Sequence, residues 1–193
     1  MEDGAGTTVP RKRSAAATRE SILAAATRRF ASQGYERSGV REIAGDAGVT
    51  AALVNRYFAS KEGLYAQVID RSFDVGDLFD GPRADLPRRI ARRAVYGHGE
   101  QGQTTLLLLL RSATEPHAAV LLKSKINQNF IQPLAQKLGG SHAEARAALI
   151  AAQLTGFATL DELIHVDVLT TADREGLVNM LVEMLQTCVG EEE

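Results

Sequence analysis

Two short helical segments separated by a single glycine constrain the fold more than any other part of this chain. The first carries Ala44 and Ala47 on the side where a second helix would cross it, and Gly48 then permits a left-handed turn. The second begins after Thr50, a residue type that caps helix N-termini well. Apolar anchors for the second helix are available at Val49, Val54 and Phe58. This pattern predicts a helix-turn-helix, although two ordinary core helices joined by a tight turn would share part of it.

The remainder of the chain is also predicted to be helical. Apolar residues recur at helical spacing from Thr18 onward, and no segment alternates β-branched with polar residues around a hairpin turn. Gly34 is placed as a helix end and Pro116 as a helix start, and Pro133 should bend or end the helix that follows. We therefore expect an all-α fold, with an N-terminal three-helix domain containing the helix-turn-helix and a C-terminal helical bundle.

Charge is distributed unevenly along the sequence. Residues 10–61 carry ten Lys and Arg against four Asp and Glu, whereas residues 62–193 carry twelve against eighteen. The net charge of −2 therefore conceals a basic front section, which favours an anionic partner such as nucleic acid. The single Cys188 excludes an intramolecular disulfide and suits the cytoplasm, and no apolar run reaches the roughly 18 residues of a membrane span.

Residues 19–64 resemble the N-terminal domain of the tetracycline-repressor (TetR) family of transcriptional regulators. The resemblance is carried, in the order and at the spacing of the family, by ILAAATRRFASQGY (22–35), VREIAGDAGV (40–49) and RYFASKEGL (56–64). It implies a DNA-binding domain followed by a domain that dimerises and binds a small-molecule effector. We place a disordered basic arm at residues 1–17, the helix-turn-helix domain at 18–66, and the ligand-binding and dimerisation domain at 67–193.

The first turn of the second helix is the end that enters the major groove in such motifs. Thr50 can cap the helix and also contact a phosphate or a base. Ala51 and Ala52 have no hydrogen-bonding side-chain atoms, so they can only contact thymine methyl groups or let the backbone approach closely. Asn55 and Arg56 are able to read base edges: Asn suits adenine and Arg suits guanine, each discriminating by about 1–3 kcal/mol in bidentate geometry.

Four further residues are candidates for holding the DNA backbone. Ser38 and Arg41 lie at the start of the first helix of the motif, where free N–H groups attract phosphate. The family resemblance implies phosphate contacts for Tyr57 and Lys61. The sequence departs from the commonest family form at Asn55, where many relatives have a tyrosine that grips a phosphate, so this shorter side chain could turn to a base instead.

A second copy of the chain is expected, because one short recognition helix offers too little contact to select one genomic site. Segment 143–160 is apolar or small around nearly its whole circumference, which predicts burial on more than one side. Together with the last helix it is predicted to form half of a four-helix dimer interface, through Ala148, Ala152, Gly156, Leu177, Leu181 and Met184. The alternative is that both helices fill the core of a monomer.

The resemblance also implies an effector site inside the C-terminal bundle. Its candidate lining residues are Leu107, Arg111, Leu122, Ile126, Asn127, Phe130 and Phe157. The leucines could equally be plain core, and Arg111 could pair with Glu115 four residues later. Because few aromatic residues occur in this region, we expect an aliphatic or amphipathic effector rather than a flat polyaromatic one.

Two other features have more than one interpretation. The arginines of RRIARR (88–93) lie one turn apart and form either a solvated helix face or a contact for an acidic ligand or a DNA backbone. Asp161 and His165 share a helix face, but two ligands do not close a metal site. No motif of nucleophilic catalysis or phosphate binding is present in a strand–turn–helix context. We expect no catalytic residue, no metal and no cofactor.

The sequence therefore predicts a cytoplasmic regulator, acting as a repressor, that binds a palindromic operator in double-stranded DNA as a homodimer. An unknown small molecule is expected to control it, and no membrane partner is expected. The alternative is a helical homodimer that uses the same module for protein interaction and has no operator. Arg56, Tyr57 and Lys61 on one side of the motif favour the DNA-binding hypothesis.

Overall fold

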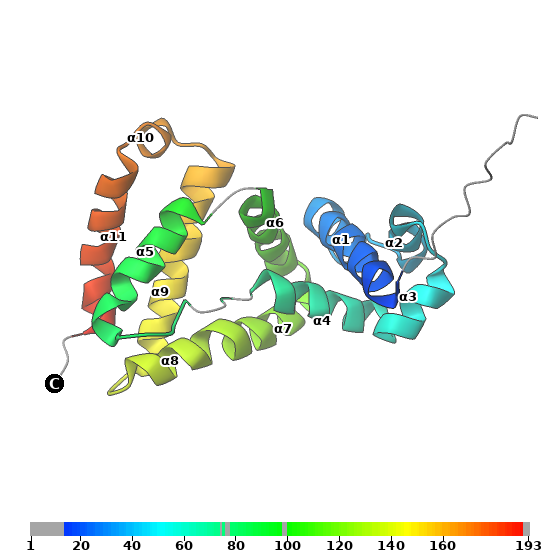
Figure 1. Ribbon diagram of the computed structural model, residues 1–193, viewed down its shortest axis with the longest axis horizontal. Coiled ribbons are helices and arrows are strands. Elements are labelled where there is room, and N and C mark those ends of the chain that lie inside the picture. The colour runs from blue at the N-terminus through cyan, green and yellow to red at the C-terminus, as the bar shows by residue number, and fades with distance from the viewer. Residues whose placement is uncertain (1–13, 74, 76–77, 98–99, 191–193) are drawn as a thin grey trace, which may run out of the picture.

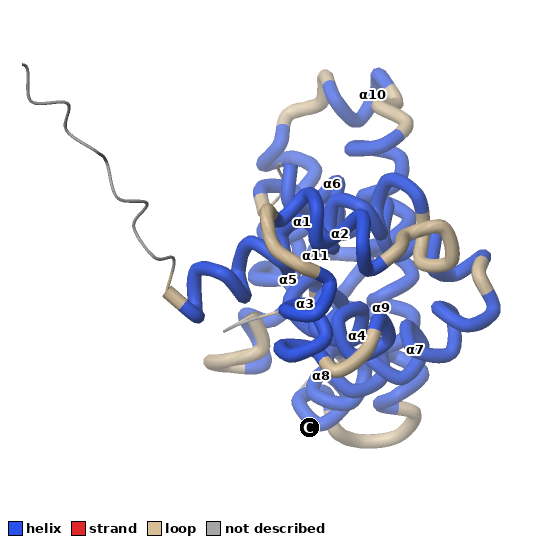
Figure 2. Tube along the Cα trace, turned by 90° about the vertical axis from the view of Figure 1, so that its right-hand side faces the viewer, coloured by secondary structure: helices blue, strands red, loops and turns tan. Residues whose placement is uncertain are grey.

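The computed structural model describes residues 14–73, 75, 78–97 and 100–190, and within these ranges the chain is helical without any strand (Figure 2). The predicted all-α fold is confirmed. Residues 1–13 of the expected N-terminal arm lie outside the described residues. The helices are α1 (Ala15–Gln33), α2 (Val40–Ala47), α3 (Ala51–Phe58), α4 (Lys61–Ser72), η1 (Arg83–Asp85), α5 (Leu86–Tyr96), α6 (Glu100–Thr114), α7 (Pro116–Ile126), η2 (Asn127–Ile131), α8 (Gln132–Leu138), α9 (Ala143–Ala158), η3 (Thr159–Leu163), α10 (Asp167–Thr170) and α11 (Arg174–Val189).

The molecule is elongated, with α1–α4 at one end, α5, α9, α10 and α11 at the other, and α6 and α7 between them (Figure 1). We call α1–α4 the head. Its hydrophobic core continues into the middle of the molecule, because Leu108 of α6 and Ala118 and Leu122 of α7 are buried in the same cluster. A second cluster joins α5, α8, α9 and α11. The boundary expected between residues 66 and 67 falls inside α4.

Short-range signals in the sequence determine where the helices of the head begin and end. The Thr50 side chain accepts a hydrogen bond from the backbone N–H of Leu53 at 3.3 Å, and Ser60 caps α4 in the same way. Gly48 has φ 67° and ψ 38°, the left-handed turn that the motif needs. Gly34 ends α1 with φ 84°. The three predicted positions, Gly34, Gly48 and Thr50, are confirmed, because each depends only on local backbone chemistry.

Two predicted boundaries differ from the structure. Helix α1 begins at Ala15 rather than Thr18, because the side chain of Ser14 accepts a hydrogen bond from the N–H of Ala17 and extends the helix by one turn. Helix α6 begins at Glu100, within the segment GHGEQGQ (97–103), whose three glycines predict an interruption between helices. Glycine in this segment lowers helix propensity without preventing a helix that packs against α1 and α7.

The predicted interruption at Pro133 is confirmed. Proline has no N–H to donate to the carbonyl four residues earlier, and its ring would collide with that carbonyl in a regular α-helix. The chain widens into the π-helical turn η2 immediately before, and Pro133 then lies in the first turn of α8. The long segment therefore divides into α7, η2 and α8.

An aromatic cluster forms the centre of the head core. Tyr65 of α4 is fully buried, and its ring lies edge-on to Phe30 at 5.3 Å and to Tyr35 at 4.9 Å between centroids. Burial raises the pKa of the Tyr65 phenol to about 12. The folded protein therefore requires the neutral phenol at position 65.

Replacing Tyr65 with phenylalanine is expected to remove a loss of stability at alkaline pH. An unfolded tyrosine ionises near pH 10, so the stabilisation is fully present below pH 10 and is lost as pH rises toward 12. The full loss amounts to about 2–3 kcal/mol for a shift of two pH units. Urea denaturation at pH 8 and pH 11 should show a smaller decrease for Tyr65→Phe than for the wild type. Equal decreases would contradict this assignment.

Candidate nucleic-acid interface

Helix α3 presents one face to the core and the opposite face to solvent. Val54 and Phe58 are buried at 1% and 4% exposure and anchor the helix in the head. Ala52, Asn55 and Arg56 are exposed on the outer face. Neither the Asn55 nor the Arg56 side chain has a hydrogen-bond partner or counter-ion among the described residues. This face therefore has both the exposure and the unused hydrogen-bonding groups that contact with base edges requires.

Helix α2 is held against α1 by polar contacts at its C-terminal end. The Ser21 hydroxyl donates to the Ala47 carbonyl at 3.0 Å, and Arg29 Nη2 lies 3.1 Å from Asp46 Oδ1. The Arg29 guanidinium, through this hydrogen bond, holds the pKa of Asp46 below its ordinary value. The pair keeps the one acidic side chain near the C-terminus of α2 neutralised, which reduces its repulsion of a DNA backbone.

The predicted phosphate-binding residues differ in whether their side chains already make contacts within the protein. Arg41 is exposed and has no hydrogen-bond or ion-pair partner among the described residues. Lys61 lies 4.3 Å above the ring centroid of Tyr35, and its ammonium group donates to the Glu36 carbonyl at 3.3 Å. Tyr57 is partly buried against the head core. Lys61 therefore fixes the loop between α1 and α2 as well as carrying a charge to this surface.

The other three predicted DNA contacts on the motif, Ser38, Ala51 and Thr50, differ in how far their side chains are buried. Ser38 is fully buried, and its hydroxyl donates to the Gly34 carbonyl at 2.6 Å, so the prediction that it contacts phosphate is wrong. The sequence could not reveal that the chain folds back here. Ala51 is partly buried against the head core, which leaves only part of its surface for DNA. Thr50 is exposed, and its hydroxyl can still donate a hydrogen bond while it caps α3.

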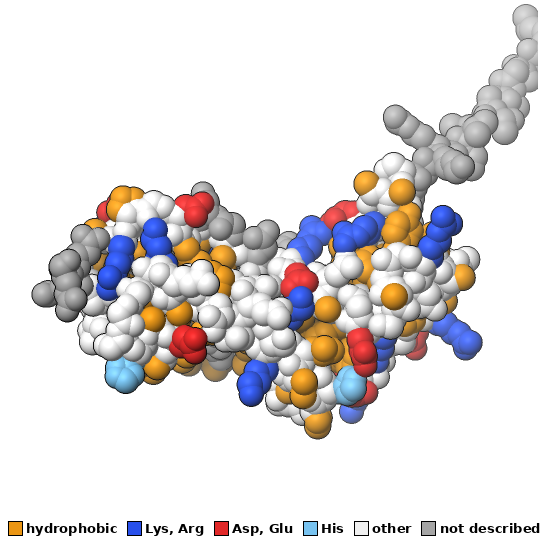
Figure 3. Space-filling view, turned by 90° about the horizontal axis from the view of Figure 1, so that it is seen from below, with side chains coloured by type: hydrophobic (Ala, Val, Ile, Leu, Met, Phe, Trp, Pro, Cys, Tyr) orange, Lys and Arg blue, Asp and Glu red, His pale blue; other side chains and the backbone are white. Residues whose placement is uncertain are grey.

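Sequence reasoning missed Arg37. This residue is exposed in the turn between α1 and α2, beside the Glu36 carbonyl that Lys61 contacts, and has no partner among the described residues. Basic side chains project from the head end of the molecule in Figure 3. A basic residue immediately before the motif was the available signal, and we add Arg37 to the candidate backbone contacts.

The turn between α6 and α7 touches the head directly. Glu115 Oε2 accepts a hydrogen bond from the N–H of Glu36 at 2.9 Å, so the alternative pairing of Glu115 with Arg111 does not form. His117 Nε2 lies 2.8 Å from Glu62 Oε1 and its ring stacks on Tyr35 with centroids 6.0 Å apart. A displacement of α6 or α7 would therefore be transmitted to the loop that precedes α2.

The predicted dimer residues fall into two groups. Ala148, Ala152 and Gly156 are exposed along α9, and we call them the small-residue strip. Leu177 and Leu181 are each 6% exposed inside the protomer, so the prediction that they form the interface surface is wrong. Helical periodicity identified the apolar face of α11 but not its partner, which is mainly α5. The outward apolar residues of α11 are Met180 and Met184, at 55% and 52% exposure.

A cavity of about 510 Å³ lies between the end of α4, α5, α6, α7, η2 and α9. Ile126 and Phe130, two of the residues predicted for the effector site, line this cavity. The other predicted lining residues do not, and those predictions are wrong for three reasons. Leu107 and Leu122 belong to the head core, Arg111 and Asn127 are exposed to solvent, and Phe157 packs in the second hydrophobic cluster. The sequence specified which helices enclose the cavity but not their rotation about their own axes.

The remaining polar candidates have structural partners. Asp161 forms two hydrogen bonds with Arg174, at 3.1 and 2.9 Å, and His165 Nδ1 lies 3.1 Å from the Asp161 carbonyl. In the described part of the chain no three His, Cys, Asp or Glu side chains gather as metal ligands would. None of the described helices is long and apolar enough to cross a membrane.

Comparison with known families assigns the chain. Residues 22–68 match the family described as bacterial regulatory proteins of the tetR family, and residues 84–189, more than half of the chain, match the tetracyclin repressor-like C-terminal domain. The protein belongs to the TetR family. The N-terminal match contains the whole helix-turn-helix, and the C-terminal match contains the small-residue strip and most of the cavity wall.

Individual relatives and solved structures are also similar to this chain. The transcriptional activator FasR of Mycolicibacterium smegmatis is 34% identical over 116 residues, which cover 54% of this chain and 52% of FasR. The match therefore spans about half the length of that relative. A TetR-family regulator of Streptomyces coelicolor has 25% identity and a TM-score of 0.58 over 94% of this chain and 99% of its own. Salmonella enterica GusR has the same fold, with 18% identity and a TM-score of 0.71 over 92% and 98%.

The protein is thus a DNA-binding transcriptional regulator. Regulators of the TetR family bind DNA as dimers, and control by a small molecule is typical of them.

Proposed function

We propose that this protein is a cytoplasmic repressor that binds a palindromic operator as a homodimer and responds to a small molecule in its C-terminal cavity. The head, with a DNA-binding unit at residues 18–66, would bind one half-site, and the unit at residues 67–193 would dimerise and bind the effector. The observation that carries the proposal is the outer face of α3, where Asn55 and Arg56 are exposed and have no partner in the described part of the chain.

The proposed division of labour separates base reading from backbone binding. Asn55 and Arg56, one turn into α3, read base edges in the major groove, and Thr50 and Ala52 lie against the same groove. The phosphates of the DNA backbone are bound by four residues: Arg37, Arg41, Tyr57 and Lys61. Ala51 contributes the part of its surface that the core leaves uncovered.

The proposed interface between protomers is formed by the small-residue strip together with Met180 and Met184. Side chains this small allow a second helix to approach closely, and the exposed methionines fill the space beside it. Leu177 and Leu181 support this surface from within the protomer. The two heads of the dimer would then meet successive major grooves on one side of a duplex.

Enrichment of DNA from a random-sequence pool, followed by sequencing, tests the proposed function. A motif with two-fold symmetry would support an operator-binding dimer, whereas the absence of any enriched motif would support the alternative protein-interaction module. The direction of regulation is tested separately with a promoter–reporter that carries the enriched site. The FasR relative is named an activator, so increased transcription in that assay would replace the repressor assignment.

Replacing Lys61 with alanine is expected to weaken binding to every DNA sequence alike. The ammonium group supplies one charge to the backbone surface, so the slope of log affinity against log salt should decrease by about one. Titration of cognate and random duplexes at several salt concentrations measures both quantities. Lys123→Ala, which removes an exposed lysine from α7, is the matched control and should change neither. A loss confined to the cognate duplex would contradict the assignment of Lys61 to the backbone.

A further inference from the structure

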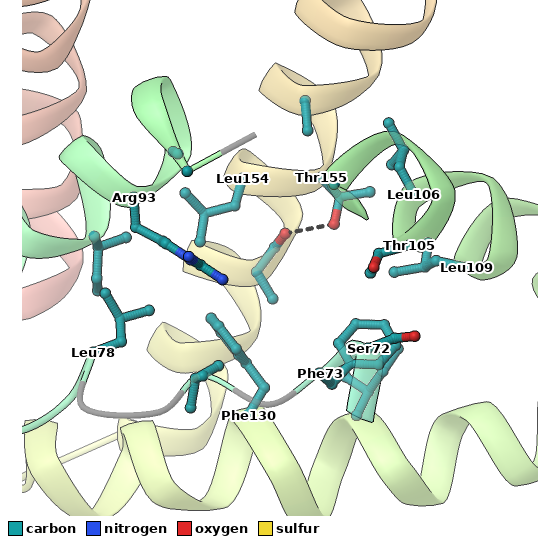
Figure 4. A pocket seen from close by; sticks show the side chains of 18 of the residues that line it. Ser72, Phe73, Leu78, Arg93, Thr105, Leu106, Leu109, Phe130, Leu154 and Thr155 are labelled. Atoms are coloured by element: carbon teal, nitrogen blue, oxygen red, sulfur yellow. Dashed lines mark hydrogen bonds between the residues drawn. The ribbon is translucent and has the colours of Figure 1, made fainter. Parts of the chain in front are cut away.

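The wall of the cavity is mainly aliphatic. Figure 4 shows Leu78, Leu106, Leu109 and Leu154 around it, with Phe73 and Phe130 as its aromatic members. A volume of about 510 Å³ is in the range of small-molecule sites, which are predominantly apolar with a few placed polar groups. Leucine side chains from several helices provide a surface for an alkyl chain but few ring faces for stacking a flat aromatic molecule.

The arginines of α5 separate into those with structural partners and one without. Arg88 and Arg92 both contact the Glu175 carboxylate, at 3.2 and 3.0 Å. Arg89 donates to the carbonyls of Leu78 and Pro82. Arg93 has no hydrogen bond or ion pair to any described residue.

Arg93 is directed toward the cavity. Its side chain is among those that line the space, and Figure 4 shows the guanidinium extending between Leu78, Leu154 and Phe130. The side chain passes over Gly97, where a Cβ atom would lie 2.7 Å from Arg93 Cδ. The Arg93 carbonyl oxygen would lie closer still, at 2.4 Å, so glycine at position 97 is required by the backbone as well as by this side chain. Arg93 thus borders a largely aliphatic space while it remains exposed to solvent.

Two other charged residues reach the cavity, and neither neutralises Arg93. Arg71 forms an ion pair with Glu20 of α1. Glu162 lies in the wall, where burial first and then the neighbouring Asp161 raise the pKa of its carboxyl, and it forms no ion pair with Arg93. The guanidinium of Arg93 remains available, with a planar set of donors that matches a carboxylate in bidentate geometry.

We infer that the cavity binds an aliphatic molecule with a single anionic headgroup, with Arg93 holding the headgroup and the leucines enclosing the chain. This inference rests on the proposed function, because it names the class of effector for the same site. For Arg93 it selects the acidic ligand among the interpretations that the sequence left open for the arginines of α5. Arg88 and Arg92 instead have a structural role, because both pair with Glu175.

Isothermal titration of the full-length protein with three ten-carbon probes tests the inference. Decanoate, decanol and decylamine share the chain and differ in headgroup charge, and all are used below their aggregation concentrations. Decanoate is expected to bind at least about 10-fold more tightly than decanol, the smallest difference expected from one charge-assisted contact. Decylamine is expected to bind more weakly than decanoate.

Two variants test whether Arg93 causes the preference for decanoate over decanol. Arg93→Gln should lower decanoate affinity to the level of decanol and leave decanol affinity unchanged. Arg92→Gln is the matched control and should leave both unchanged, because Arg92 faces Glu175 instead of the cavity. Equal binding of decanoate and decanol by the wild type, or full decanoate affinity in Arg93→Gln, would overturn the inference. Preferred binding of decylamine, lost in Glu162→Gln, would overturn it in favour of a cationic ligand.

A DNA-binding measurement keeps this test separate from the proposed function. Ligand-free Arg93→Gln should bind the enriched operator as the wild type does, because Arg93 belongs to α5, whose buried residues pack in the second cluster, whereas α3 packs in the head core. If an operator is enriched but decanoate does not bind, the effector class is wrong and the proposed function stands. If decanoate binds with the predicted dependence but no operator is enriched, the proposed function fails instead.

Discussion

Arginine in place of Ala152 is expected to leave each protomer folded but to make the protein monomeric. Ala152 is exposed at the middle of the small-residue strip, so the new side chain meets solvent in a monomer and causes no clash inside the protomer. In a dimer it would place a large charged group where two helices approach closely, and its burial without a partner would be strongly unfavourable.

The loss of the dimer should also be seen in DNA binding. Two linked heads bind their half-sites with an avidity that exceeds that of one head by about 100-fold or more, and a monomer forfeits this gain. Analytical ultracentrifugation and titration of the enriched operator measure the two effects. Ala113→Arg, at an exposed alanine of α6 outside the strip, is the matched control and should remain dimeric. A dimeric Ala152→Arg protein would exclude the strip as the interface.

Arg56→Ala is expected to relax the sequence preference of the protein at one base pair in each half-site. A bidentate contact between arginine and guanine is worth about 1–3 kcal/mol of discrimination, which corresponds to roughly 5- to 150-fold. Because Arg56 has no structural partner among the described residues, its removal should not disturb the fold of the head.

Affinities for the enriched operator and for single-base variants at each position measure this preference. Arg56→Ala should bind the operator and one particular variant almost equally, and Asn55→Ala should do the same at an adjacent base pair. Lys61→Ala provides the contrast, because it should weaken all duplexes and keep the preference. If Arg56→Ala and Lys61→Ala lost affinity equally on cognate and random DNA, the division between base-reading and backbone-binding residues would be wrong.

The parts of this structure that follow from local chemistry could be predicted from the sequence. Thr50 and Ser60 cap helices because a hydroxyl near a helix N-terminus satisfies a free N–H, and Gly48 turns the chain because glycine tolerates positive φ. Pro133 interrupts its helix because proline has no N–H to donate. None of these effects depends on a partner distant in the sequence.

The parts that depend on which helix faces which could not be predicted. The apolar periodicity of α11 is the same whether Leu177 meets α5 or a second protomer. The leucines of α6 divide between the head core and the cavity, and only the rotation of α6 determines which is which. Ser38 was assigned to DNA from its position before α2, but a hydrogen bond to Gly34 turns it inward. Arg93 differs from its neighbours because Glu175 pairs with Arg88 and Arg92 and two backbone carbonyls accept hydrogen bonds from Arg89.

The central claim is that the outer face of α3, from Thr50 to Arg56, enters the major groove in two copies. Dimethyl sulfate probing of the enriched operator tests it most directly, since this reagent methylates guanine N7, which lies in the major groove. We predict protected guanines in two half-sites whose centres are one or more helical turns apart, and loss of one protected guanine per half-site in Arg56→Ala. The claim would be contradicted if the wild type bound the operator without protecting any guanine N7, or if Arg56→Ala protected the same guanines as the wild type.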